Sequence, residues 1–255
     1  MLLCCMYHRV EADKDSNSRL ILEQHFRYIS ESFNVVLPGE ALSDDVPNVC
    51  LVFDDASYSF YQYVFPLLRQ TGIRVLLAVA PRFILEADGG IGSEKRLSVP
   101  TDQMMQSTTY ANAVPFCTWA ELRELCGSGL VRIASHSYSH KNLLFSRHLD
   151  DEIKKSEEVI EEKLLQPVDS FVYPYGQFNA SVAEQVGAHY RYSFAVGAGD
   201  NVSWRGVGGI LFRIAADDLP DPTSIFSRSN LMKYRLLRYR LYAKKWYYMN
   251  HRVPV

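Results

Sequence analysis

Val49-Cys50-Leu51-Val52-Phe53-Asp54-Asp55 decides the fold, because five apolar residues run directly into two adjacent carboxylates. A short run of β-branched and apolar residues that stops at charged ones is typical of a buried strand that delivers side chains to the rim of a sheet or barrel. A second run, at 130–134, leads in the same way to His136-Ser137-Tyr138-Ser139-His140. Functional groups gather at such rims, so we expect the chemistry at these two strand ends.

Two imidazoles and one carboxylate from neighbouring strand ends are sufficient to hold a divalent metal with an open coordination position. We therefore predict a metal site formed by Asp55, His136 and His140. Such a metal lowers the pKa of a bound water and polarises an amide carbonyl, which predicts a hydrolase. Asp54 points elsewhere, since adjacent strand residues face opposite ways, and is predicted to act as the general base. Taken singly, an Asp-Asp pair also suits a solvated turn or a helix cap, and histidines four apart are common on the surface of a helix.

Strand-like and helix-like segments alternate along most of the chain. The apolar runs that predict strands are 2–7, 49–53, 73–80, 130–134, 170–173 and 192–196, and the patterns that predict helices are 19–32, 58–70, 118–127, 148–165 and 179–187. Thr118 and Glu121 have the spacing of a capping box, which supports a helix start at this point. The alternation is typical of βα units, so the fold class is predicted to be α/β with a largely parallel sheet or barrel.

The composition fits one large folded domain. Of the 255 residues, 47% are hydrophobic and 22% are charged, which is the balance of a globular chain with a substantial core. The five cysteines are an odd number without C-x-x-C spacing, and at least three lie in apolar runs, so buried reduced thiols are predicted. Residues 1–6 have no basic segment and form too short an apolar run for a secretory signal or a membrane span, which predicts a cytoplasmic protein.

Two segments stand apart from the rest of the predicted domain, which spans residues 1–230. Residues 82–115 are rich in Gly, Ser, Thr and Asn and are long for a connection, so they are either a disordered insertion or a lid over a cleft; the lid is favoured. The tail, residues 231–255, carries seven of the 27 basic residues and none of the 29 acidic ones. Its formal charge is therefore +7, against −9 for residues 1–230 with their 20 basic and 29 acidic residues.

The tail is predicted to be a helix in which cations are mixed with aromatic residues and leucines. Through residues 231–252 such a helix can lie in a membrane interface with its cations toward anionic headgroups. It can equally dock on the acidic body of the protein, and the sequence leaves both alternatives open. Nucleic acid is not a predicted partner, because the rest of the chain is acidic.

Three motifs in this order resemble the first three signature motifs of the polysaccharide deacetylases, the NodB-homology or carbohydrate esterase family 4 group. They are Phe53-Asp54-Asp55, His136-Ser137-Tyr138-Ser139-His140 and Tyr173-Pro174-Tyr175-Gly176, and the resemblance spans roughly residues 7–214. It implies a distorted (β/α) barrel that removes acetyl groups from N-acetylated sugars with a divalent metal, most often zinc. The same ligands also suit cobalt, nickel or manganese.

The start of the chain resembles one branch of this family. Members usually end with a Leu-x-x-His motif that supplies the general acid, and no such motif follows Val196. Tyr7-His8 closes the first predicted strand instead, as in the circularly permuted branch of the poly-N-acetylglucosamine deacetylases. The resemblance therefore implies that His8 is the general acid, which protonates the leaving amine; a core histidine bonded to a carbonyl is the alternative.

The third motif and two later residues are predicted to complete the site. The turn around Pro174 exposes the backbone N–H of Tyr175, which is predicted to stabilise the oxyanion of the tetrahedral intermediate. The residues predicted to line the substrate site are Tyr173, Pro174, Trp204 and Arg213. By itself, Tyr-Pro-Tyr-Gly is an ordinary turn sequence, and Trp204 also suits a packing role.

Three positions depart from the family pattern. Many relatives have Gly after the Asp pair, where this chain has Ala56, and this is a mild change if the backbone there has a negative φ. The arginine that many relatives use to hold the catalytic aspartate corresponds to Val172, so another group must orient Asp54 or its pKa will be higher. The fourth motif is reduced to the spacing of Asp200 and Trp204.

These observations predict a metal-dependent N-deacetylase that releases acetate from an N-acetylated sugar of a cell-envelope, capsule-type or lipid-linked glycan. The alternatives are an amide hydrolase acting on a non-carbohydrate small molecule and a catalytically inactive glycan-binding relative. The remaining histidines are predicted to be surface residues and two aromatic residues to be core, and these are His25, His148, His189, His251, Tyr192 and Phe194.

Overall fold

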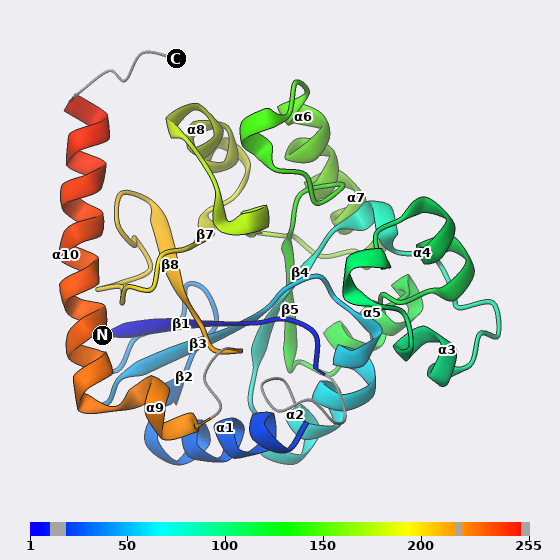
Figure 1. The fold of residues 1–255 in the computed structure, drawn as a ribbon, viewed down its shortest axis with the longest axis horizontal. Coiled ribbons are helices and arrows are strands. Elements are labelled where there is room, and N and C mark those ends of the chain that lie inside the picture. Colours follow the sequence, from blue (N-terminus) through cyan, green and yellow to red (C-terminus); the bar gives the residue numbers. More distant parts are fainter. Residues whose placement is uncertain (11–18, 218–220, 251–255) are drawn as a thin grey trace.

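In the computed structural model, which describes residues 1–10, 19–217 and 221–250, seven parallel strands close into a barrel and an eighth, β2, pairs with β3 outside the ring (Figure 1). The strands are β1 (Leu2–Tyr7), β2 (Asn34–Val35), β3 (Asn48–Phe53), β4 (Val75–Val79), β5 (Val131–Ser135), β6 (Ser170–Val172), β7 (Tyr192–Val196) and β8 (Ile210–Ala215). The ring runs β1-β8-β7-β6-β5-β4-β3 and closes through the pairing of β1 with β3. The predicted α/β barrel is confirmed.

The barrel is distorted at two places. β2 and β4 share one edge of β3, because β2 pairs with Asn48 and Val49 while β4 pairs with Val52 and Phe53. β5 and β6 are joined by a single residue pair, Ser135 with Phe171. The ring is therefore complete but irregular, as the predicted distorted barrel requires.

Helices surround the strands (Figure 1). They are α1 (Arg19–Ser32), α2 (Phe65–Thr71), α3 (Ser93–Leu97), α4 (Ser107–Ala113), α5 (Trp119–Gly127), α6 (Leu149–Glu152), α7 (Lys154–Leu164), α8 (Ala180–His189), α9 (Pro222–Phe226) and α10 (Arg228–Asn250). A π-helical turn at Phe60–Val64 precedes α2. The predicted capping box is present at the start of α5, where the side chains and backbone of Thr118 and Glu121 bond reciprocally.

Alternation along the strands separates two cores. One residue set faces into the barrel and packs there, and it consists of Leu2, Cys4, Val36, Cys50, Val52, Leu76, Ala78, Ala134, Val172, Tyr192, Phe194 and Leu211. The residues between them, such as Leu3, Leu51 and Ile133, belong to the larger core that packs against the helices. Because successive side chains point to opposite faces of a strand, this parity determines which residues reach the inside of the barrel at its far end.

Residues 82–115 contain α3 and α4 and are held by two arginines. Arg96 is buried, donates to the backbone carbonyls of Val114 and Phe116, and forms a bidentate pair with Glu121 at 2.7 and 2.8 Å. Arg9, next to the first strand, donates to two backbone carbonyls at the end of α3 and just beyond it. These contacts favour a folded segment at residues 82–115 over a disordered insertion. Its function as a lid stays a prediction.

One predicted surface histidine is wrong and two core aromatics are confirmed. His25 is buried on α1, and its Nδ1 lies 3.1 Å from the hydroxyl of Tyr7, a partner that no pattern in the sequence indicated. His148 is exposed, His189 pairs with Glu157 at 2.7 Å, and His251 lies outside the described residues. Tyr192 and Phe194 are buried inside the barrel.

The five cysteines are free thiols, four of them buried, as predicted. Among the helices of residues 19–217 and 221–250, none is long and apolar enough to cross a membrane.

Candidate metal and acid-base site

On four strands, every second side chain faces into the barrel. At one end of the barrel these inward positions are occupied by histidine, aspartate and arginine residues. Past β1, β3 and β5 the next inward positions are His8, Asp54 and His136. On β8 the inward series that starts at Leu211 continues to Arg213 and, beyond the strand, to Asp217. The carboxyl ends of parallel strands meet at the same rim, so residues far apart in the chain are brought together there.

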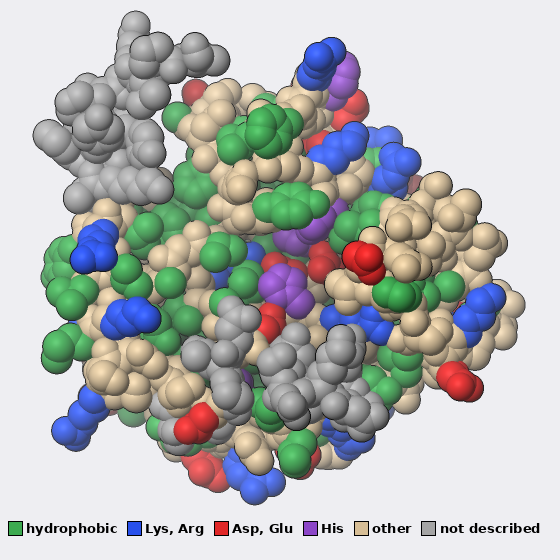
Figure 2. All heavy atoms as spheres, in the orientation of Figure 1, with side chains coloured by type: hydrophobic (Ala, Val, Ile, Leu, Met, Phe, Trp, Pro, Cys, Tyr) green, Lys and Arg blue, Asp and Glu red, His purple; other side chains and the backbone are tan. Residues whose placement is uncertain are grey.

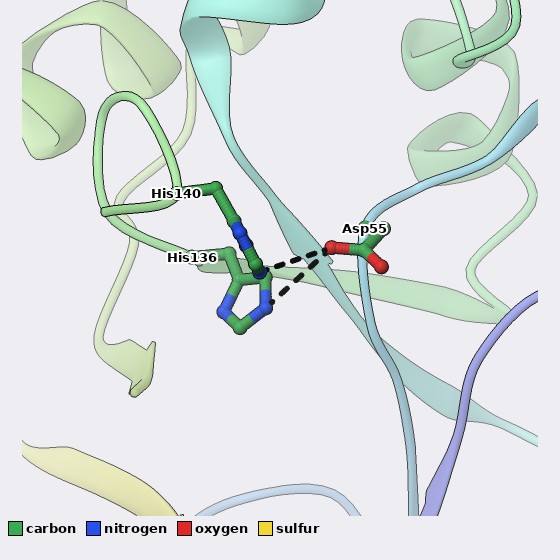
Figure 3. Close-up of side chains that lie close together, drawn as sticks. All are labelled: Asp55, His136 and His140. Atoms are coloured by element: carbon green, nitrogen blue, oxygen red, sulfur yellow. Dashed lines mark ion pairs between the residues drawn. The ribbon is translucent and has the colours of Figure 1, made fainter. Parts of the chain in front are cut away.

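Asp55, His136 and His140 form the predicted cluster (Figure 3). The Oδ1 atom of Asp55 lies 3.4 Å from Nε2 of His140 and 3.7 Å from Nε2 of His136, and all three ligand atoms lie within 4.8 Å of one another. Two ligand atoms that are each about 2.1 Å from a tetrahedral ion lie about 3.4 Å apart. The buried Oδ1 of Asp55 has no hydrogen-bond partner within the described part of the chain, so the arrangement fits a divalent cation.

The backbone is turned sharply at each motif of the cluster. Within the described ranges eight non-glycine residues have positive φ, and five of them lie here: Asp55, Ala56, Ser137, His140 and Tyr175, with φ between 50° and 70°. Left-handed conformations of such residues cost of order 1–3 kcal/mol each and gather at functional sites. The turn at φ 70° swings Asp55 toward the histidines although it follows Asp54 directly. Ala56 has φ 50°, so the condition for a mild Gly-to-Ala change is not met.

The ring of His136 is oriented by a backbone carbonyl. Its Nδ1–H donates to the carbonyl of Val172 at 2.8 Å, which leaves Nε2 directed at Asp55. Burial lowers the pKa of His136 to about 4, against the raising effect of the two carboxylates, so the imidazole is neutral, as a metal ligand must be.

The loop that carries both histidines is held by Glu152 of α6. This buried carboxylate accepts from the backbone N–H and the hydroxyl of Ser139, at 2.8 and 2.5 Å. Tyr138 donates its N–H to the backbone carbonyl of the same residue. Glu152 was not among the residues predicted for the site, and its place on α6 gave no local signal.

Asp54 is held by Arg213, which lies on β8. The Nη1–H of Arg213 donates to Oδ1 of Asp54 at 2.6 Å, and both side chains are buried. Burial raises the pKa of Asp54, but the charge and the hydrogen bond of Arg213 and the charge of His8 outweigh it and lower this pKa below its usual value. Another group therefore does orient Asp54, although Val172 occupies the position of the usual arginine. Arg213 was predicted to contact substrate; its buried guanidinium contacts the carboxylate of Asp54 instead.

His8 is paired with a carboxylate that the sequence did not reveal. Its Nδ1–H donates to Oδ2 of Asp217 at 2.5 Å, and its backbone N–H donates to Oδ1 of the same residue at 3.1 Å. Its Nε2 is directed to Oδ2 of Asp54, 3.7 Å away. Burial lowers the pKa of His8, but the hydrogen bond to Asp217 and the charges of Asp54, Asp217 and Asp55 raise it to about 9. His8 is therefore protonated at neutral pH while Asp54 is ionised.

Two of the other residues predicted to line the substrate site lie elsewhere. Tyr173 is fully buried and packs against Phe171 and Phe178, because its parity turns it toward the helices. Trp204 donates its Nε1–H to the carbonyl of Glu40 and packs against Tyr192, the first residue of β7, at the opposite end of the barrel. Both predictions are corrected.

The Pro174 turn remains beside the cluster. Pro174 itself is buried. Tyr175 is largely exposed, and its ring centroid lies 5.0 Å from that of His140. Figure 2 shows purple histidine and red acidic side chains together in a hollow near the centre of the face drawn. The site opens to solvent on this face.

Removal of Arg213 is expected to leave the buried carboxylate of Asp54 without its ion-pair partner. Because breaking a buried ion pair by removing one partner costs about 3–5 kcal/mol, Arg213→Leu is expected to lower the free energy of unfolding by about this amount in urea denaturation at pH 7. The depressed pKa of Asp54 stabilises the wild type above the unfolded-state pKa, and this contribution is lost as the pH falls through the folded-state value. The difference between the two proteins should therefore narrow in acid.

A double variant provides the control for this ion pair. Asp54→Asn removes the stranded charge, so in Asp54→Asn/Arg213→Leu the two losses should not add. Additive losses in the double-mutant cycle would contradict the pairing.

The comparisons with known proteins agree with this geometry. The family model described as polysaccharide deacetylase matches residues 42–192. No curated protein sequence matches the chain. Among solved structures, a polysaccharide deacetylase from Bacillus cereus is similar with a TM-score of 0.70 at 15% identity, over 90% of this chain and 68% of that one.

Two further structures are similar over nearly their whole length. A deacetylase from Streptococcus pyogenes, solved in complex with acetate, has a TM-score of 0.68 at 16% identity, over 91% of this chain and 97% of its own. A de-N-acetylase from Aggregatibacter actinomycetemcomitans has a TM-score of 0.65 at 20% identity, over 91% and 99%. At these identities the likeness shows a shared fold.

Proposed function

The chain belongs to the polysaccharide deacetylase family, and from this premise we propose that it is a metal-dependent N-deacetylase that releases acetate from an N-acetylated sugar of a glycan. One observation carries the proposal. A carboxylate and two imidazoles with the spacing of metal ligands lie beside an ionised Asp54 and a protonated His8. Two titratable groups whose pKa values are pushed apart are the arrangement that separates a base from an acid.

Asp55, His136 and His140 would hold the metal. The donor set of two nitrogens and one oxygen suits Zn²⁺, and also Co²⁺, Ni²⁺ or Mn²⁺. When bound, the ion supplies a Lewis acid that activates water and polarises the amide carbonyl of the acetamide group.

Asp54 would serve as the general base. Its Oδ1 is occupied by Arg213, so Oδ2 is the atom available to accept a proton. This Oδ2 lies 3.9 Å from Nε2 of His136 and 3.7 Å from Nε2 of His8, between the metal ligands and the acid. The lowered pKa of Asp54 keeps it ionised and ready to accept at neutral pH.

His8 would serve as the general acid and Tyr175 as the oxyanion donor. An amine leaves poorly until it is protonated, and the Nε2–H of His8 can donate that proton because Asp217 holds the ring in its charged form. The backbone N–H of Tyr175 belongs to the turn that packs against His140, which supports its assignment to the oxyanion. A general acid directly after β1 supports placing the chain in the branch with an N-terminal Tyr-His.

The structure bears on the two alternative functions that the sequence left open. A glycan-binding relative without activity was suggested by the missing arginine at Val172 and by the reduced fourth motif, and the contact of Arg213 with Asp54 answers the first of these two reasons. An amide hydrolase for a non-carbohydrate compound remains the second candidate, because the site's chemistry is that of any acetamide. A cell-envelope, capsule-type or lipid-linked glycan is the proposed source of the sugar, and the cytoplasmic location stays a prediction.

Elemental analysis of the purified chain, together with an acetate-release assay on N-acetylated oligosaccharides, tests the proposal. We expect one divalent metal per chain and acetate release that a chelator abolishes. Metal without turnover on any glycan would favour a binding protein. Turnover only on small non-sugar amides would favour the second candidate.

Asp217→Asn is expected to shift the alkaline limit of activity. In the wild type, activity should fall as the pH rises through about 9, because His8 then loses the proton it donates. Because the pKa of His8 is higher in the folded than in the unfolded protein, its protonation stabilises the fold. This stabilisation is fully present below the unfolded-state pKa of about 6.5 and is lost as the pH rises through the folded-state pKa of about 9. Without the charge of Asp217 the pKa of His8 moves back toward about 6.5, so the alkaline limb of a pH profile of kcat should move to lower pH.

The matched control is Asp44→Asn, which removes an exposed carboxylate that is not part of the site. Its profile should match the wild type. An unshifted alkaline limb in Asp217→Asn would exclude His8 as the titrating acid.

A further inference from the structure

The long C-terminal helix α10 presents two opposite faces. With 23 residues it is about 34 Å long. Its inner face packs on the barrel through the buried Tyr234 and the partly buried Leu231 and Leu241. Gly199 allows a close approach, because a Cβ there would lie 3.2 Å from the backbone nitrogen of Arg238. The docking that the sequence left open is therefore present along this face.

An ion pair holds the inner face in place. The Nη1–H of Arg238 donates at 3.0 Å to Oδ2 of Asp200, a fully buried carboxylate just after β7. Asp200 is therefore used to hold the C-terminal helix and has no role at the Asp55–His136–His140 cluster, which lies at the other end of the strands. Among the cations of this helix whose side chains are described, Arg238 is used within the protein, whereas Lys233, Arg235 and Arg240 are exposed.

The outer face carries a second apolar stripe. Met232, Leu236 and Tyr239 follow one another at i, i+4 and i+7 and are 66%, 62% and 64% exposed. On a helix of 3.6 residues per turn these positions lie on one face, opposite Tyr234 and Leu241. A helix that only docks on its own domain has no need of a second apolar stripe in water.

Cations flank this stripe on both sides. Arg235 lies along one side, and Lys233 and Arg240 lie along the other; all three are exposed. The helix contains no acidic residue. Figure 2 shows green and blue side chains mixed along the left side of the view, where α10 lies in Figure 1. Long cationic side chains beside apolar and aromatic ones are the pattern of a helix that rests on an anionic bilayer surface.

We propose that the outer face of α10, formed by Met232, Lys233, Arg235, Leu236, Tyr239 and Arg240, is a docking surface for an anionic phospholipid membrane. Charge complementarity selects this occupant, since three exposed cations and no acid oppose a negative headgroup layer. The inner face and the Asp200–Arg238 pair fix the helix to the barrel. Binding would therefore bring the whole domain to the membrane without unfolding the helix, and it would be independent of catalysis.

Vesicle co-sedimentation of the full chain tests this surface. Vesicles of phosphatidylcholine with phosphatidylglycerol should bind the protein, binding should weaken as salt rises, and vesicles of phosphatidylcholine alone should bind far less. Lys233→Gln/Arg235→Gln/Arg240→Gln should lower the partition coefficient on the order of 100-fold. Met232→Ser/Leu236→Ser/Tyr239→Ser should lower it as well, with acetate release from a soluble oligosaccharide unchanged in both.

The matched control is Leu20→Ser/Arg27→Gln, which changes one exposed apolar residue and one exposed cation on α1. It should bind vesicles like the wild type. Equal binding by all variants, or no preference for the anionic lipid, would overturn the proposal. A change of sedimentation coefficient in the outer-face variants without vesicle binding in the wild type would also overturn it, since the face would then be a protein interface.

Discussion

His136→Ala is expected to remove both the bound metal and the deacetylase activity. His136 supplies one of three ligand atoms that lie within 4.8 Å of one another, and its burial keeps the imidazole neutral, as coordination needs. The ion is proposed to contribute several kcal/mol of transition-state stabilisation. Since each 1.36 kcal/mol is a factor of ten, the loss should be at least about 10³-fold. Metal content and acetate release, measured on the same sample, check this.

His148→Ala is the matched control, because this histidine is exposed and lies outside the cluster. It should retain the metal and the activity. Removing the metal from the wild type with a chelator should reproduce the loss, and adding Zn²⁺ back should restore turnover in the wild type but not in His136→Ala. Wild-type metal content in His136→Ala would show that the cluster does not hold the ion.

Asp54→Asn is expected to abolish turnover while the metal stays bound. The Oδ1 atom of Asp54 is taken by Arg213, and Asp54 is not one of the three residues whose ligand atoms converge, Asp55, His136 and His140. A positioned general base contributes about 10²–10⁴-fold, so kcat should fall by this factor. Metal content should remain that of the wild type.

Asp55→Asn distinguishes the two adjacent carboxylates. It removes the oxygen that faces both imidazoles, so this variant should lose metal as well as activity. The pair of variants separates a base from a ligand at neighbouring positions of one turn. Full activity in Asp54→Asn would rule out its role as the base.

Most of the barrel could be predicted because its signals are local. The predicted strand at 2–7 and the helix at 19–32 match β1 and α1. β8 was missed, although it closes the ring between β7 and β1. Its apolar run is interrupted by Arg213. An arginine within such a run argues against a buried strand as long as its buried ion-pair partner is unknown.

The substrate-site residues were predicted less well, for a related reason. Tyr173 belongs to a recognisable motif, yet the alternation of β6 turns its side chain to the helices. Trp204 lies near Asp200 in sequence, and both residues are used at the other end of the barrel. A motif determines which residues are present, whereas the strand parity determines which face they occupy.

The sequence by itself determined the three residues of the candidate metal site and the class of fold. Asp55, His136 and His140 are recognisable because the residue types that bind metals and the ends of apolar strands can both be identified from a few consecutive residues. Only the tertiary structure decided what surrounds them. Arg213 and Asp54 are 159 positions apart, and His8 and Asp217 are 209 apart. Ring closure sets β8 beside β1, and the pairing of β1 with β3 completes the rim, so residues with no local signal become the partners of the base and the acid.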